Sequence, residues 1–136
     1  MLFQNQAEMN SRIRIAALLG LVGVVLGALG SHALKALLAP EALESFEVGV
    51  RYQMLHALLL LAVEALPILS ERYKRIIGRL VVSGVLTFSG SIYLLSTRAI
   101  SGLDLSFLGP VTPVGGLLLI AAWVMLIRAT FTYLPR

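Results

Sequence analysis

Four long apolar runs dominate the sequence and limit what the chain can fold into. They cover residues 13–34, 48–69, 76–96 and 111–127. The hydrocarbon core of a bilayer is roughly 30 Å thick, and a helix of about 20 apolar residues crosses it. The chain is 136 residues long, 58% hydrophobic and only 13% charged. A chain this short could not bury so much apolar surface in the core of a water-soluble fold. The runs predict an all-α integral membrane protein, with four transmembrane helices in an antiparallel bundle.

The charged residues predict how this bundle is oriented. We expect an N-terminal tail over residues 1–11 and one membrane domain over residues 12–134. Lys35, Arg51 and Arg98 fall on one side of the bundle, and the other side holds the remaining basic residues: Arg12, Arg14, Arg72, Lys74, Arg75, Arg79, Arg128 and Arg136. The positive-inside rule places both termini in the cytoplasm of a multi-pass protein of the cell (inner) membrane. The net charge of +4 is explained in this way without a nucleic-acid partner.

Small residues recur at helical spacing within three of the runs. Pairs of small residues four positions apart let the backbones of neighbouring helices approach closely. We therefore assign a helix-packing role to Gly23, Gly27, Gly30, Ser31, Ser89, Gly90, Ser91, Gly115 and Gly116. A polar path along Ser83, Thr87 and Ser91 is the alternative. Packing is favoured because hydroxyls in membranes usually bond to their own backbone or to a neighbouring helix.

Two histidines interrupt the apolar sequence and are expected near the outer leaflet. His32 closes the first run and His56 lies near the start of the second, with Tyr52 and Tyr93 as possible neighbours. Three interpretations stay open: a hydrogen-bonded clasp between helices, a ligand or proton site, and a metal or bis-histidine haem site. Two histidines are few for a metal, so neither a metal nor another cofactor is predicted.

A glutamate, Glu64, lies inside the second apolar run near its cytoplasmic end. A buried carboxylate needs a partner or a proton. Arg79 in the third run and Arg128 in the fourth are expected at similar depth, so the sequence predicts an intramembrane ion pair of Glu64 with one of them. A proton-coupled site is the alternative.

Catalytic patterns do not emerge from the sequence. No serine has a histidine and a carboxylate at a recognised spacing, and neither a phosphate loop nor a dinucleotide fingerprint is present. Cysteine is absent, which excludes disulfides and thiolate chemistry. A non-enzymatic role is the favoured interpretation.

Several short strings occur in an order that resembles a known family. They are GALGSHAL (27–34), YQMLHAL (52–58), FSGSIYLL (88–95) and TPVGG (112–116), followed by Trp123. Together they resemble the YgdD type of small bacterial membrane protein, a domain of unknown function that is similar to a small mitochondrial transmembrane protein. The resemblance implies a four-helix inner-membrane protein and brings no settled activity. The chain departs from the family pattern at Ser31 and Ala122, where the family tends to have other small residues.

These observations lead to three functional hypotheses. The first is a non-enzymatic protein that binds a lipid, a quinone-like amphiphile or a partner membrane protein at an outer-leaflet cluster of His32, Tyr52, His56 and Tyr93. The second is an oligomeric channel or proton-linked transporter that uses Ser83, Thr87 and Glu64. The third is a haem or metal redox protein. The lipid bilayer is the expected surrounding in each case, and a homo-oligomer is a possible assembly.

Overall fold

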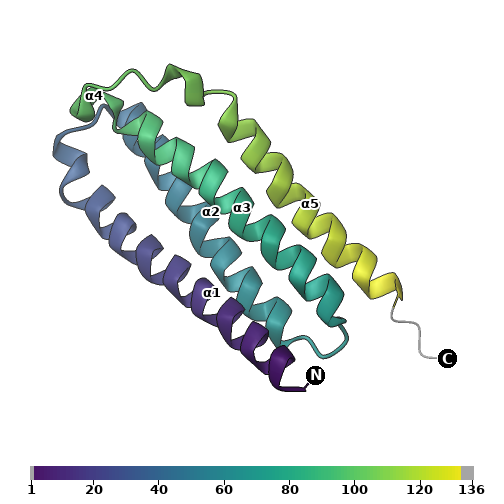
Figure 1. The fold of residues 1–136 in the computed structure, drawn as a ribbon. Coiled ribbons are helices and arrows are strands. Elements are labelled where there is room, and N and C mark those ends of the chain that lie inside the picture. The colour runs from purple at the N-terminus through teal and green to yellow at the C-terminus, as the bar shows by residue number, and fades with distance from the viewer. Residues whose placement is uncertain (1, 133–136) are drawn as a thin grey trace.

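The computed structural model describes the backbone of residues 2–132 and the side chains of residues 6–132 (Figure 1). Four long helices make up most of it: α1 (Leu2–Ser31), α2 (Pro40–Ala65), α3 (Glu71–Ser96) and α5 (Val111–Thr132). The connections hold a short helix, α4 (Arg98–Ser101), and two 3-10 turns, η1 (Leu34–Ala36) and η2 (Ser106–Leu108). All four long helices have the length and apolar composition to cross a membrane. The predicted all-α membrane fold is confirmed.

The helix boundaries follow from local chemistry. Pro40 opens α2, where its missing N–H has no helical partner to lose. Ala65 ends α2 because Pro67 disfavours helical geometry in the residue before it, and Leu66 is extended. At the other terminus, α1 begins at Leu2, so residues 2–11 extend the first helix where the sequence predicted a tail. Met1 and residues 133–136, including Arg136, lie outside the described part of the chain.

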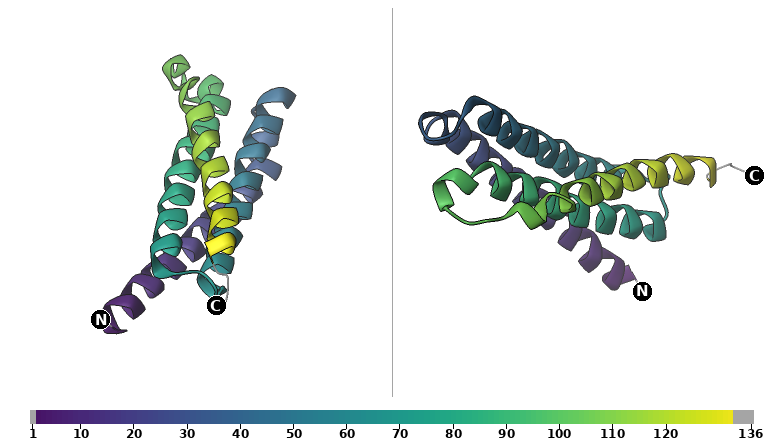
Figure 2. Two further views of the ribbon diagram at one scale, coloured as in Figure 1. Left: turned by 90° about the vertical axis from the view of Figure 1, so that its right-hand side faces the viewer. Right: turned by 90° about the horizontal axis from the view of Figure 1, so that it is seen from above.

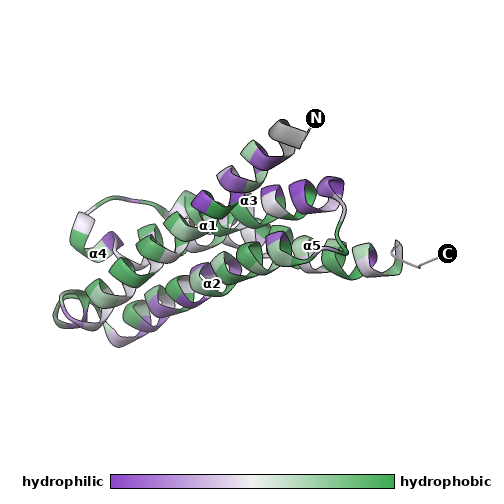
Figure 3. Cartoon of the chain, turned by 90° about the horizontal axis from the view of Figure 1, so that it is seen from below, coloured by the Kyte–Doolittle hydropathy of each residue, from purple (hydrophilic) through white to green (hydrophobic). Residues whose placement is uncertain are grey.

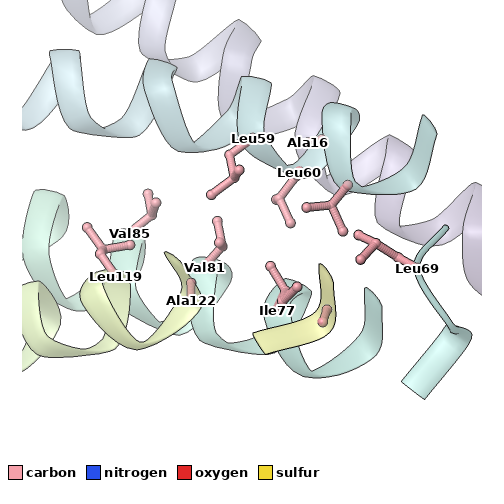
Figure 4. Close-up of a cluster of buried hydrophobic side chains, with 11 residues drawn as sticks. Ala16, Leu59, Leu60, Leu69, Ile77, Val81, Val85, Leu119 and Ala122 are labelled. Carbon is pink, nitrogen blue, oxygen red and sulfur yellow. The ribbon is translucent and has the colours of Figure 1, made fainter. Parts of the chain in front are cut away.

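The helices pack in the order α1, α2, α3, α5. The extensive contacts join α1 to α2, α2 to α3, and α3 to α5, and none of similar extent joins α1 to α5 in the described residues. Figure 1 shows α1 and α5 on opposite flanks of the central pair, and Figure 2 shows α1 running obliquely to the other long helices. Between the helices lies one hydrophobic cluster (Figure 4): Ala16, Leu59, Leu60, Leu69, Val63, Ile77, Val81, Val85, Leu119, Ala122 and Ala129. The bundle is therefore a curved layer in which α2 and α3 are buried most.

Glycine is required where α3 and α5 meet. A Cβ added at Gly115 would collide with the backbone of Phe88, and one added at Gly84 would collide with the side chain of Leu119. On α1, Gly23, Gly27 and Gly30 face α2, whereas a Cβ at Gly90 would meet nothing within 4 Å. Close approach of α5 therefore depends on two glycines, one on each helix.

The two ends of the bundle differ in charge. We call the end that holds the start of α1, the end of α2, the start of α3 and the end of α5 the basic end, and the other the far end. Figure 3 shows hydrophilic residues gathered at the starts of α1 and α3. Most acidic residues, namely Glu41, Glu44, Glu47 and Asp104, belong to the far end, beside Lys35, Arg51 and Arg98.

Candidate functional site

The partner of the buried glutamate Glu64 is Arg12 of α1. The guanidinium donates from Nε to Glu64 Oε1 at 2.5 Å and from Nη2 to Oε2 at 3.1 Å. The side chain of Glu64 is 4% exposed and that of Arg12 is 12% exposed. A two-pronged pair of this kind fixes the relative orientation of the two groups and neutralises both. It joins α1 to α2 at the basic end.

This partner differs from the predicted ones. From the sequence, Glu64 was predicted to pair with Arg79 or Arg128, because all three were expected at similar depth. In the structure Arg79 and Arg128 are exposed, and neither contacts Glu64. Arg12 was not predicted as a partner, because it precedes the first apolar run and was counted only among the basic residues that orient the bundle. The extension of α1 to residue 2 brings it alongside Glu64.

Two further residues tie α3 into the same network. Arg12 Nη2 also donates to Glu71 Oε2 at 2.8 Å, and Lys74 Nζ donates to the backbone carbonyl of Glu64 at 2.9 Å. Glu71 stands in the first turn of α3, where the helix dipole favours an anion. Lys74 is buried against the last turn of α2, where the dipole favours a cation. Both charges therefore suit the helix ends that they touch.

A groove opens beside this network between α1 and α3. Its volume is about 350 Å³, and its walls combine charged, hydroxyl and apolar side chains: Glu8, Ser11, Arg12, Ile15, Leu60, Arg75, Gly78, Arg79, Val82 and Ser83. Arg75 is held by Glu8 at 2.8 Å. Arg79 reaches the groove without an ion-pair partner among the described side chains. The groove therefore offers one cation whose charge is not balanced by a carboxylate.

His56 forms a hydrogen-bonded clasp in the middle of the bundle. Its Nδ1 lies 2.7 Å from the backbone oxygen of Tyr52, which can only accept, so Nδ1 carries the proton. The other nitrogen, Nε2, accepts a hydrogen bond from Trp123 Nε1 at 3.3 Å. The imidazole is thus buried and has a hydrogen-bond partner at both nitrogens. It joins α2 to α5, and Trp123 is the partner that the sequence analysis did not identify.

The predicted outer-leaflet cluster is not assembled around the two histidines. His32 is exposed just after the end of α1. Gly30 lies against Phe46 of α2, and the ten residues from Phe46 to His56 span about 15 Å of helix. Tyr52 packs on Phe88, with ring centres 4.7 Å apart. The structure therefore leaves His56 and Tyr52 as neighbours and separates His32 from them.

Tyr93 belongs to another polar chain, centred on Gln53. The Tyr93 hydroxyl donates to Gln53 Oε1 at 2.9 Å, and Gln53 Nε2 donates to the carbonyl of Leu19 at 2.7 Å. This buried glutamine connects α3, α2 and α1. Gln53 was missed, although a glutamine within the apolar run YQMLHAL is a signal for an interhelical hydrogen bond.

Three hydroxyls of α3, those of Thr87, Ser89 and Ser91, bond locally or to the adjacent helix. Thr87 donates to the carbonyl of Ser83 at 2.7 Å, and Ser89 donates to the carbonyl of Gly49 at 2.8 Å. Ser91 contacts Thr112 of α5 through their hydroxyl oxygens, 2.6 Å apart. No group of three histidine or carboxylate side chains within the described residues is arranged to hold a metal ion. The network at the basic end adjoins the groove between α1 and α3, and Thr112 lines a second pocket at the far end of the bundle.

Comparisons with known proteins give the chain a family. The family model described as a protein of unknown function, DUF423, matches residues 26–116. A UPF0382 membrane protein of Staphylococcus haemolyticus is 37% identical over 121 residues, which are 89% of this chain and 95% of the relative. One of Bacillus subtilis is 36% identical over 127 residues, covering 90% and 97%, and one of Schizosaccharomyces pombe is 38% identical over 114 residues, covering 83% and 95%.

No solved structure matches the chain. The relatives carry membrane-protein names, which agrees with the four apolar helices described above. The match to the family model covers more than half of the chain and reaches from the end of α1 to the start of α5. The resemblance to an uncharacterised membrane family is thus confirmed, and the chain belongs to the DUF423 family of membrane proteins.

Proposed function

We propose that this protein binds an anionic membrane amphiphile in the groove between α1 and α3, without turning it over. The observation that carries this proposal is Arg79, a cation in a partly apolar groove that has no ion-pair partner among the described residues. An unbalanced arginine at the edge of a bilayer attracts phosphate or carboxylate, and its planar guanidinium can bind either group with two hydrogen bonds.

The remaining walls of the groove suit an amphiphile. Ile15, Leu60 and Val82 offer an apolar surface for the first part of an acyl chain, and the hydroxyls of Ser11 and Ser83 are available to a headgroup. The volume of about 350 Å³ lies at the lower end of the range for small-molecule sites. Acidic headgroup oxygens beside Arg79 and an acyl chain along the groove would satisfy both kinds of surface.

The expected orientation favours an acidic lipid. The positive-inside rule places the basic end in the cytoplasm, and with it both termini of a protein in the cell (inner) membrane. Basic residues near a cytoplasmic leaflet attract anionic lipids by about 1 kcal/mol each. The alternative site predicted from sequence, around His32 and His56, is supported less well, because the nitrogens of His56 are occupied and His32 lies apart.

Native mass spectrometry of the full-length protein tests the proposal. Phosphatidylglycerol and phosphatidylcholine of equal chain length are titrated against the wild type, Arg79→Gln and, as a matched control, Arg72→Gln. Arg72 is an exposed arginine on the same helix that does not line the groove. We expect Arg79→Gln to lower phosphatidylglycerol binding about tenfold, since a hydrogen bond to a charged group contributes roughly 1.5–3 kcal/mol. Arg79→Lys should retain more binding than Arg79→Gln.

Equal binding by Arg79→Gln and Arg72→Gln would contradict the proposal. So would equal binding of the two lipids to the wild type, because the groove would then not discriminate by charge.

A further inference from the structure

A second pocket lies at the far end of the bundle, and nothing in the proposed function uses it. Its volume is about 610 Å³, and it is formed by the start of α2, the last turns of α3, α4 and the start of α5. Its lining residues include the polar Glu41, Ser96 and Arg98.

The first turn of α2 enters this pocket with unused backbone donors. Its N-cap residue is Ala39, which has no side chain that could accept a hydrogen bond from them. The N–H of Leu43 bonds to the carbonyl of Ala39, whereas those of Glu41 and Ala42 have no partner among the described residues. Free N–H groups and the helix dipole together favour an anionic group at this position.

Ser96 supplies an independent sign of a ligand. The residue is 6% exposed and lines the pocket, and its hydroxyl is the one buried side-chain polar atom without a hydrogen-bond partner in the described part of the chain. A buried hydroxyl without a partner is unfavourable by about 1–3 kcal/mol. A ligand oxygen that accepts from Ser96 removes this penalty.

The two charges in the pocket are opposite and do not pair. The described residues include no salt bridge of either Glu41 or Arg98. A ligand that carries only an anionic group would leave Glu41 unbalanced, and a cationic one would leave Arg98 with only the more distant carboxylate of Asp104 as a counter-charge. A ligand with both a phosphate and an ammonium group balances both side chains and also uses the free N–H groups of α2.

The surroundings of the pocket favour a lipid over a soluble molecule. The connection between α3 and α5 exposes Ile100, Leu103 and Phe107, and the α1–α2 connection exposes Leu37. Exposed apolar side chains in loops at the end of a transmembrane bundle are stable in the interfacial layer of the bilayer, where headgroups lie. We propose that the far-end pocket binds the headgroup of a zwitterionic phospholipid, with its phosphate near Arg98 and α2 and its ammonium near Glu41.

The test compares phosphatidylethanolamine with phosphatidylglycerol by native mass spectrometry of the full-length protein. All variants are made in the Arg79→Gln background, so that binding at the basic-end groove contributes little. Glu41→Gln should weaken the binding of phosphatidylethanolamine about tenfold and leave the binding of phosphatidylglycerol unchanged or stronger. Arg98→Gln should weaken the binding of both lipids about tenfold. Ser96→Ala should weaken both about threefold.

Glu44→Gln and Lys35→Gln serve as controls, because both residues are exposed at the far end and outside the pocket. The proposal is overturned if Glu41→Gln and Arg98→Gln behave like these controls, or if Glu41→Gln weakens both lipids equally. Displacement of the lipid by soluble phosphoethanolamine would also overturn it, because a soluble zwitterion would then suffice. If Arg79→Gln bound phosphatidylglycerol as well as the wild type does, only the basic-end proposal would be contradicted. The two failures are therefore distinguishable.

Discussion

At the scale of single residues, the pair Arg12–Glu64 is the most consequential contact. Both charges are largely buried, so each depends on the other for neutralisation. We expect Arg12→Gln or Glu64→Gln alone to destabilise the fold by about 3–5 kcal/mol, because each leaves an uncompensated buried charge. The change is measured as thermal stability in detergent.

A double variant separates this charge effect from packing. Arg12→Met with Glu64→Met removes both charges and should recover most of the stability that either single substitution loses. If Glu64→Gln alone were as stable as the wild type, the ion pair would not contribute to the stability of the fold.

The two histidines should respond differently to substitution. His56→Ala removes the clasp between α2 and α5 and leaves the Trp123 N–H without its partner, so we expect a loss of about 1–3 kcal/mol. His32→Ala should change stability by less than about 0.5 kcal/mol, because its side chain is exposed. Trp123 is the only tryptophan in the chain, so its fluorescence reports directly on the clasp. Equal effects of the two substitutions would argue for a shared site instead.

Asp104 provides a pH-dependent contact in the connection between α3 and α5. The hydroxyl and backbone N–H of Ser106 both donate to its carboxylate and lower the pKa of Asp104 below its usual value. A lowered pKa means that the contact is complete above the ordinary aspartate range and is lost as the pH falls through the lowered value.

We expect Ser106→Ala to raise the pKa of Asp104 toward its ordinary value, because one of the donors is removed. Asp104 is the only aspartate, so carbon-13 labelling of aspartate gives a single NMR signal to titrate. An identical titration midpoint in both proteins would show that the hydroxyl does not hold the carboxylate.

At the scale of helices, the closest packing is between α3 and α5. A Cβ at Gly115 would meet the backbone of Phe88, which cannot move aside as a flexible side chain can. Gly115→Ala should therefore destabilise the protein by about 1–3 kcal/mol or more. Gly90→Ala is the matched control, since its Cβ would enter open space and alanine favours a helix. Thermal unfolding of the two variants measures the difference, and equal stability would show that α5 can move outward freely.

At the scale of the whole molecule, the distribution of charge predicts which end faces the cytoplasm. The chain has no cysteine, so single substitutions give a clean labelling experiment. Ser101→Cys at the far end should react with a membrane-impermeant maleimide added outside intact cells. Thr130→Cys at the basic end should react only after the membrane is opened, because positively charged ends stay in the cytoplasm. The reverse pattern would contradict the orientation, although not the fold.

The open arrangement of the helices has a further consequence for the whole molecule. Because α1 packs mainly on α2 and α5 mainly on α3, both present long apolar faces to their surroundings, including Leu18, Leu21, Leu117 and Ile120. In a bilayer these faces contact acyl chains, so they need no protein partner to be stable. The groove lies between α1 and α3, which make no extensive direct contact within the described residues.

The sequence alone determined the fold class, the four crossings and the family. Hydropathy and helical length are local properties of the chain, and a bilayer leaves helices as nearly the only way to satisfy the backbone of a long apolar run. The polar residues that need partners, such as Glu64 and His56, could also be recognised from their apolar neighbours in sequence.

Only the tertiary structure decided which partners they have. Arg12 pairs with Glu64 because α1 continues past its apolar run, and Trp123 reaches His56 because glycines bring α5 onto α3. These contacts depend on the rotation and relative height of helices far apart in sequence, which no local pattern encodes. The same geometry separates His32 from His56 and leaves Arg79 in a groove without an ion-pair partner among the described residues.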